Sequence, residues 1–261
     1  MRRGDKESGE SSSPCLLVSL SYGMIVPMSA EKKQTIAFIL CGALAREVIA
    51  ITRRHGWDVA LFGVAASDHM QPVRIAPDVE RRLRELIPRF ERIVVLYGDC
   101  GTSGRLDEVL ARYNVPRIAG PHCYEMYGGL AFDAQMESDP GAFFLTDFLV
   151  RGFEGTIAKG LGLDRFPELR DVYFANYNRL IYMVQQEDAA LIAKAHLIAA
   201  RLGLPLELQR TGYGQLEQRL VDLMAEIHQP RYAPVLADAV EDGAVRLPHS
   251  ARRRRTAPRE Q

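Results

Sequence analysis

Short apolar runs alternate with amphipathic stretches along most of the chain. Each run is rich in β-branched residues, and the stretch after it repeats apolar residues at helical spacing. Strands are predicted at 35–40, 59–64, 93–97, 115–119, 143–147 and 206–208, and helices at 43–55, 77–87, 106–113, 148–161, 171–185, 188–202 and 215–227. Strands that alternate with helices favour a parallel sheet. We therefore expect an α/β fold with an open, mostly parallel, doubly wound sheet of the Rossmann-like type, and an additional helical segment around residues 148–203.

Both ends of the chain depart from this pattern. Residues 1–33 are polar and serine-rich, then largely apolar from Cys15 to Met28, and are predicted to be a disordered or spurious extension. The apolar part resembles a signal peptide, but acidic residues precede it and Pro27 interrupts it. Residues 231–261 contain a run of four arginines and are predicted to be mostly disordered. Residues 34–230 then form a single α/β domain, with two lobes as the alternative.

The charge of the chain is balanced, with 33 Lys and Arg against 33 Asp and Glu in 261 residues. Such a chain has no global field to attract nucleic acid or an anionic membrane, which favours a small-molecule substrate or a protein partner. No apolar run reaches the roughly 20 residues that a membrane helix needs. Four cysteines are too few for a secreted disulfide scaffold, so a reducing cytoplasm is the predicted location.

Three of the four cysteines follow predicted strands. Cys41 follows strand 35–40, Cys100 follows strand 93–97, and Cys123 follows strand 115–119. Ligands of open parallel sheets bind outside the carboxyl ends of the strands, so we expect these thiols to converge. Thiolates bind soft or borderline metals, which predicts a zinc ion or an iron–sulfur cluster, with His122 as a further ligand. The alternative is that each cysteine is a small buried hydrophobe.

Other polar side chains near the cysteines are candidates for catalysis. Asp99, Glu125 and His69 could transfer protons, and His69 is also an alternative fourth metal ligand. Turn formation is the alternative role for Asp99.

Two glycine-rich loops could bind an anionic cofactor through backbone N–H groups. The candidate residues are Gly98, Gly101 and Thr102 in the first loop, and Gly212 and Gly214 in the second. Neither loop matches the dinucleotide-binding or the Walker A pattern.

Five short motifs lie within roughly residues 34–228: Cys41-Gly42, Tyr97-Gly-Asp-Cys-Gly101, His122-Cys123 after Pro116-Arg-Ile118, Phe144-Leu-Thr-Asp147 and Thr211-Gly-Tyr-Gly214. Together they resemble DUF1638, a prokaryotic family whose function is unknown. Members of this family often occur beside corrinoid-dependent methyltransferase genes. The resemblance therefore implies one-carbon metabolism, and a corrinoid methyltransferase system protein as a partner, but no activity.

Three hypotheses follow. The first is a metal-dependent cytoplasmic protein, an enzyme or an accessory factor of corrinoid-linked methyl metabolism, with Cys41, Cys100 and Cys123 as metal ligands. The second is a non-catalytic protein that binds a small ligand or a methyltransferase partner. The third is a metal-free α/β enzyme with a cysteine nucleophile, activated by His69 or His122.

Overall fold

The computed structural model describes residues 34–229 and 232–235. Residues 34–229 fall within one compact unit. The predictions made for residues 1–33, and for 231 and 236–261, lie outside the described residues.

Six strands of the described chain form two three-stranded sheets, and every neighbouring pair in them is parallel. The first sheet has the order β2-β1-β3 and contains β1 (Gln34–Cys41), β2 (Ala60–Val64) and β3 (Phe90–Leu96). The second has the order β4-β5-β6 and contains β4 (Ala142–Thr146), β5 (Arg179–Val184) and β6 (Leu206–Arg210). The predicted α/β fold with parallel strands is confirmed, and the strands are divided between two sheets.

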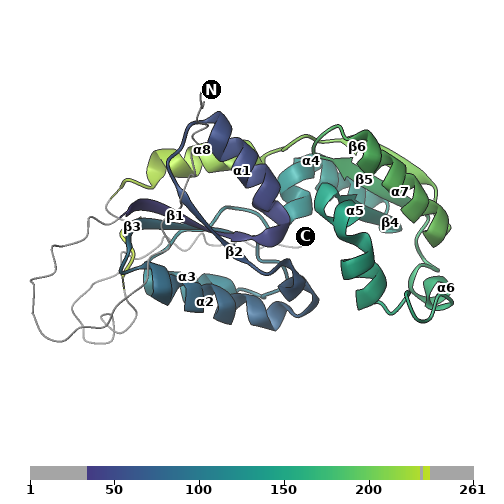
Figure 1. The fold of residues 1–261 in the computed structure, drawn as a ribbon, viewed down its shortest axis with the longest axis horizontal. Coiled ribbons are helices and arrows are strands. Elements are labelled where there is room, and N and C mark those ends of the chain that lie inside the picture. Colours follow the sequence, from purple (N-terminus) through teal and green to yellow (C-terminus); the bar gives the residue numbers. More distant parts are fainter. Residues whose placement is uncertain (1–33, 230–231, 236–261) are drawn as a thin grey trace, which may run out of the picture. The chain divides into compact units, whose positions relative to one another are not determined.

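The helices lie along the faces of the sheets (Figure 1). They are α1 (Ala45–Arg54), α2 (Ile75–Leu86), α3 (Arg105–Tyr113), α4 (Cys123–Ser138), α5 (Asp147–Phe153), α6 (Leu169–Tyr173), α7 (Ala189–Leu202) and α8 (Leu216–Glu226). The short turns are the 3₁₀ segments η1 (Gly42–Leu44), η2 (Ala66–Met70) and η3 (Pro72–Arg74), and the π-helical η4 (Glu154–Ala158). Figure 1 shows α1 and α8 on one side of β1–β3, and α2 and α3 on the other, as in a doubly wound fold.

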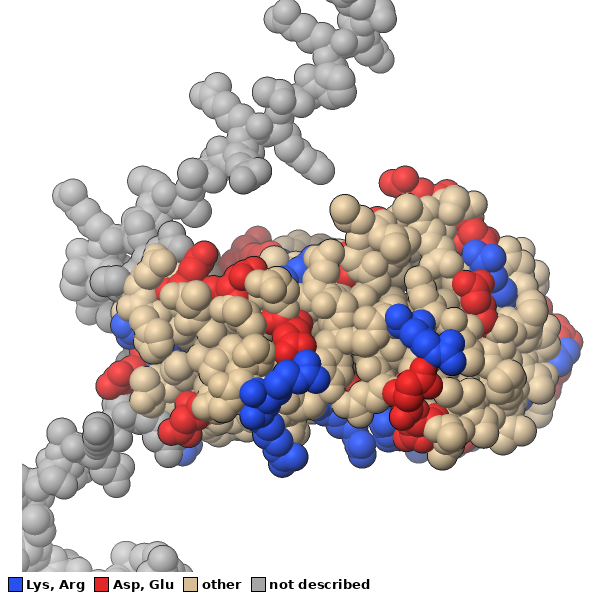
Figure 2. All heavy atoms as spheres, turned by 90° about the horizontal axis from the view of Figure 1, so that it is seen from above, with Lys and Arg blue, Asp and Glu red and all other residues tan. Residues whose placement is uncertain are grey.

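None of the described helices combines the length and the apolar character needed to cross a bilayer. On the face shown in Figure 2, basic side chains lie among acidic ones rather than in one patch.

The two sheets share one hydrophobic core, and the second sheet also packs in another. Phe38 and Ile39 of β1 are fully buried, as expected for a strand covered on both faces. Because neighbouring residues of a strand point to opposite faces, β4 and β5 divide their side chains between two cores. Phe144 and Met183 belong to the core that contains β1. Their neighbours, such as Leu145, pack in a second core with α5 and α7.

The prediction of a strand at 115–119 is wrong. This segment forms only an isolated bridge, in which Val95 donates to the carbonyl of Pro116 and Ile118 donates to the carbonyl of Val95. Pro116 has no N–H to offer a neighbouring strand, which limits the pairing of this segment. Cys123 is consequently the first residue of α4 rather than a residue at a strand end.

The prediction of a helix over 171–185 is also wrong. The additional helical segment expected around residues 148–203 is present as α5, α6 and α7, with β5 inserted between α6 and α7. The region contains the short helix α6 and then β5, the central strand of the second sheet. Residues 180–184 are all buried and almost uniformly apolar. Such a run has the same pattern in a buried strand and in a buried helix, so periodicity does not distinguish the two.

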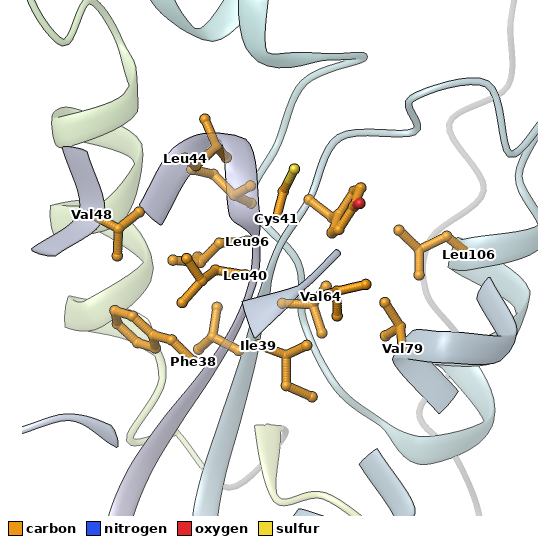
Figure 3. Close-up of a cluster of buried hydrophobic side chains, with 14 of the residues drawn as sticks. Phe38, Ile39, Leu40, Cys41, Leu44, Val48, Val64, Val79, Leu96 and Leu106 are labelled. Atoms are coloured by element: carbon orange, nitrogen blue, oxygen red, sulfur yellow. The ribbon is translucent and has the colours of Figure 1, made fainter. Parts of the chain in front are cut away.

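The order of the first sheet positions a crevice. Since β1 lies between β2 and β3, the chain moves to one side after β1 and crosses to the other side after β2. Ligands of such sheets bind at this change of direction, outside the carboxyl ends of the strands. Figure 3 shows Cys41 at the end of β1, with its sulfur directed away from Leu40 and Ile39.

Candidate functional site

A cavity of about 470 Å³ lies next to the segments that follow β1, β2 and β3. Cys100, Gly101, Cys123, His69 and His122 line it, so five of the predicted site residues share one cavity. Six other lining residues are aromatic: Tyr124, Phe132, Phe143, Phe144, Phe148 and Tyr177. A cavity of this size and polarity suits a small, largely apolar ligand.

The three predicted cysteines approach one another from three separate segments. Cys41 ends β1, Cys100 lies in the loop after β3, and Cys123 begins α4. Cys41 is buried and packs beside the cavity wall, where its sulfur accepts a hydrogen bond from the N–H of Ala43 at 3.4 Å. All three are free thiols.

The thiols influence one another's ionisation. Burial raises the pKa of Cys100 to about 12, and the nearby Cys41 contributes to the rise. Burial also raises the pKa of Cys123, with further contributions from Cys100 and Cys41. The pKa of Cys41 is raised by burial as well. Without a bound cation, all three groups are therefore neutral thiols at neutral pH, and once one thiolate has formed its charge makes the next one harder to form.

His69 lies against Cys41. Its Nδ1 is 3.9 Å and its Nε2 is 4.0 Å from the Cys41 sulfur. The ring stacks on Tyr97 at a centroid distance of 5.6 Å, and Nδ1 is 3.1 Å from the carbonyl oxygen of Ala66. Burial lowers the pKa of His69, so the imidazole is neutral. With Nδ1 donating to Ala66, Nε2 carries the lone pair that a metal or a proton would use.

His122 caps the first turn of α4. Its Nδ1 accepts a hydrogen bond from the N–H of Glu125 at 3.3 Å, which satisfies one of the free donors of the helix N-terminus. The rings of Phe132 and Tyr124 meet it edge-on. Burial lowers the pKa of His122. The ring therefore has a structural role through one nitrogen while it also lines the cavity.

Asp99 and Thr102 do not line the cavity; they stabilise the turn that leads into α3. The Asp99 carboxylate accepts hydrogen bonds from the Thr102 hydroxyl at 2.6 Å, the Gly104 N–H at 2.9 Å and the Ser103 N–H at 3.3 Å. The hydrogen bond from Thr102 is the main reason that the pKa of Asp99 lies below its ordinary value. This is the turn role that was the alternative for Asp99.

Glu125 also lies away from the cavity lining. Its two carboxylate oxygens accept hydrogen bonds from the Arg219 guanidinium at 2.6 and 2.7 Å. This bidentate pair joins α4 to α8, and Glu125 is only 8 % exposed. Its carboxylate is therefore held in a structural ion pair and is not directed at the cysteines.

Gly98 allows two cysteine-bearing segments to meet. A Cβ at this position would lie 2.6 Å from the carbonyl oxygen of Pro121 and 2.8 Å from backbone atoms of His122. In the same place the N–H of Cys100 donates to the carbonyl of Pro121 at 2.8 Å. Gly101, with φ of +84°, lines the cavity itself.

We expect Gly98→Ala to lower the free energy of unfolding by about 1–3 kcal/mol, because the added methyl group meets backbone atoms that cannot rotate away. It should also separate Cys100 from Cys123. Gly63→Ala is the matched control, since nothing lies within 4 Å of a Cβ there. Urea unfolding measures both variants, and a change within about 0.5 kcal/mol is expected for Gly63→Ala. Equal stability of the two variants would contradict the close approach.

Gly212 and Gly214 belong to a turn outside the cavity. The Gly212 N–H donates to the carbonyl of Val184, and the Gly214 N–H donates to the carbonyl of Thr211. A Cβ on Gly214 would lie 2.1 Å from the carbonyl oxygen of Tyr127. These glycines allow a close backbone contact, and their N–H groups are already used within the fold.

Two buried polar side chains near the cysteines, Tyr97 and Asp68, were not among the predicted site residues. The Tyr97 hydroxyl and the Asp68 Oδ2 are both buried without a hydrogen-bond partner among the described residues. Burial raises the pKa of Tyr97, followed by the effects of Cys41, Cys100 and Asp68. Their positions in the sequence were a usable signal, since Asp68 precedes His69 and Tyr97 opens the loop that carries Cys100.

Comparison with known protein families adds one match. Residues 64–220 match the family described as "Protein of unknown function (DUF1638)". The chain belongs to this family. The matched region of this DUF1638 protein contains Cys100 and Cys123, whereas Cys41 and the whole of β1 precede it. No curated protein and no solved structure matches the chain.

Among the described residues, no group of three or more His, Cys, Asp or Glu side chains is arranged to hold a metal ion. The three sulfurs of the DUF1638 protein therefore approach one another without meeting at one point.

Proposed function

We propose that Cys41, Cys100 and Cys123 hold a zinc ion or an iron–sulfur cluster beside the aromatic cavity, and that the protein binds a small, largely apolar molecule there. The observation that carries the proposal is the position of three free thiols from three separate segments: Cys100 and Cys123 line the cavity, and Cys41 lies against His69, which also lines it. Ligands of parallel sheets bind outside the carboxyl ends of the strands, and this cavity lies beside the segments that follow β1, β2 and β3.

The electrostatics of the cavity favour a cation. No lysine or arginine is among its described lining residues, and burial keeps both of its histidines neutral. Arg117, outside the lining, lowers the pKa of Cys100, but burial has the larger effect, so a thiolate is only partly compensated. A soft metal ion would compensate it fully, because a coordinating thiol is deprotonated outright. The same argument disfavours the metal-free cysteine nucleophile, since a reactive cysteine needs a lowered pKa and Cys100 has one of about 12.

Three thiols and an imidazole are donor groups that suit zinc, although the three sulfurs do not meet at one point. Three thiols with a neutral imidazole form a Cys₃His set, which is common for structural zinc, and three thiols alone leave a coordination position open for a ligand. His69 is the better fourth donor of the two histidines, because His122 uses its Nδ1 to cap α4. Side-chain rotation has to bring the sulfurs together, as expected where metal binding is coupled to the final folding of a site.

The chemistry of such a site depends on the metal. A bound zinc ion activates a thiol or a water molecule, as in methyl transfer and in hydrolysis. Membership of the DUF1638 family leaves the link to corrinoid-dependent methyl transfer as a prediction. The aromatic wall of the cavity supports a ligand with an apolar or methyl-bearing part.

Metal and acid-labile sulfide analysis of protein purified without oxygen, together with its absorption spectrum, tests the proposal. We expect about one zinc ion, or several irons with matching sulfide, per chain. Iodoacetamide should label the three cysteines only after a chelator has removed the metal. A metal-free protein with one rapidly labelled cysteine would instead support the nucleophile. Intact metal with stable binding of a methyltransferase and no turnover would identify a non-catalytic accessory protein.

A further inference from the structure

A second cavity, of about 320 Å³, lies beside the first. The first turn of α1 and the inner face of α5 line it, and Ala43 and Phe148 line both cavities. Three charged side chains reach the second cavity: Arg46 and Glu47 of α1, and Arg151 of α5. Its character therefore differs from that of the aromatic cavity.

Glu47 is a buried carboxyl group, and one of its two oxygens has no hydrogen-bond partner among the described residues. It is 3 % exposed, and the oxygen without a partner is Oε2. A buried polar atom without a partner costs about 1–3 kcal/mol, and more when it is charged. Such an atom on a cavity wall indicates that a bound group completes its hydrogen bonding.

The two arginines supply positive charge to the same cavity. No carboxylate among the described residues forms an ion pair with Arg46 or with Arg151, and Arg151 makes only a long hydrogen bond, 3.4 Å, to the carbonyl of Asp147. The positive end of the α1 dipole adds to this charge. Two guanidinium groups at a helix N-terminus are suited to an oxyanion.

We propose that the second cavity binds the phosphate group of a small molecule, with Arg46 and Arg151 balancing its charge and Glu47 sharing its proton. A carboxyl group beside an anion is repulsive unless one proton lies between the two. A phosphate dianion retains a proton and can donate it to the Glu47 carboxylate, whereas a sulfate dianion has no proton to donate. The site is independent of the proposed metal, because none of its three charged residues is a proposed ligand.

The surroundings of Glu47 are consistent with a shared proton. Burial raises its pKa, Asp147 of α5 raises it further, and Arg151 and Arg46 oppose the rise. Tyr127 of α4 also interacts with Glu47. A carboxylate in this setting is a stronger proton acceptor than that of an exposed glutamate.

Phosphate and sulfate binding, measured by isothermal titration calorimetry on the full chain, test the proposal. At a pH where both are dianions they have the same shape and charge, but only phosphate retains a proton. We expect wild-type protein to bind inorganic phosphate at least about tenfold more tightly than sulfate. Glu47→Gln should narrow this difference, because an amide can donate to either anion. Equal affinities in the wild type, or no saturable phosphate binding, would overturn the proposal.

The arginines provide a second, independent test. Arg46→Gln with Arg151→Gln should weaken phosphate binding at least about tenfold. Arg53→Gln, on the same helix but outside the cavity lining, should leave it unchanged, and circular dichroism checks that each variant is folded. Unchanged binding in the double variant would overturn the proposal. Phenyl phosphate identifies the source of the phosphate: tighter binding than inorganic phosphate indicates an ester that reaches the aromatic cavity, and equal binding indicates free phosphate.

Discussion

Replacing Cys100 with serine should abolish stoichiometric metal binding. Cys100 lines the cavity and interacts with both of the other thiols, so its loss removes one of three soft donors. A serine hydroxyl is a poor ligand for zinc and for iron–sulfur clusters. We expect the affinity for metal to fall by at least about 100-fold, more than the loss of an outer hydrogen-bond partner of a metal ligand usually causes. Metal content after gel filtration against a weak chelator measures the loss.

Cys15→Ser is the matched control, because it also removes one thiol but is not one of the proposed metal ligands. It should retain the metal content of the wild type. Full retention of metal by Cys100→Ser would refute the three-cysteine site. Equal loss in both variants would show that the cysteines act through something other than this cavity.

Replacing Asp147 with alanine should lower the free energy of unfolding by about 3–5 kcal/mol. The carboxylate is 1 % exposed and accepts hydrogen bonds from the Tyr182 hydroxyl at 2.8 Å, the Gln185 N–H at 3.0 Å and the Gln186 N–H at 3.1 Å. Its removal leaves three donors without an acceptor inside the domain. The melting temperature should fall by about 6–20 °C for a domain of this size.

Asp107→Ala provides the comparison for this effect. Asp107 also forms an ion pair, with Arg117, but its side chain is 53 % exposed. Surface pairs of this kind contribute less than about 1 kcal/mol. If thermal or urea unfolding shows the same loss for both variants, the buried network of Asp147 does not have the stabilising role assigned to it.

The sequence predicted best those features that depend on local pattern. The strand 35–40 and the helix after it have clear periodicities, and both are present as β1 and α1. The convergence of Cys41 and Cys100 could also be predicted, because it follows from the general position of ligands at the ends of parallel strands. The segment 180–184 could not be assigned, since a continuous apolar run lacks the alternation that identifies a strand.

The roles of individual polar residues were the hardest to predict. Asp99 and Glu125 are close to cysteines in the sequence. The Asp99 carboxylate nevertheless accepts hydrogen bonds within its own turn, and the Glu125 carboxylate forms an ion pair with Arg219. That outcome depends on partners up to 94 residues away, which no local pattern contains. Glu47 was missed for the opposite reason. It lies on an ordinary amphipathic helix, and only the packing of α5 against the first turn of α1 encloses it.

Because the two sheets share a hydrophobic core, ligand binding in the aromatic cavity can be measured as a change in the stability of the domain. Because β4 and β5 bury Phe144 and Met183 in the core that contains β1, neither sheet can open without exposing apolar surface of the other. A compound that occupies the aromatic cavity touches segments from both halves, so its binding energy adds to the stability of the entire domain. At a concentration of 100 times its Kd, that addition is about 2.7 kcal/mol. A melting curve recorded with each compound of a chemical library can therefore identify ligands of this cavity.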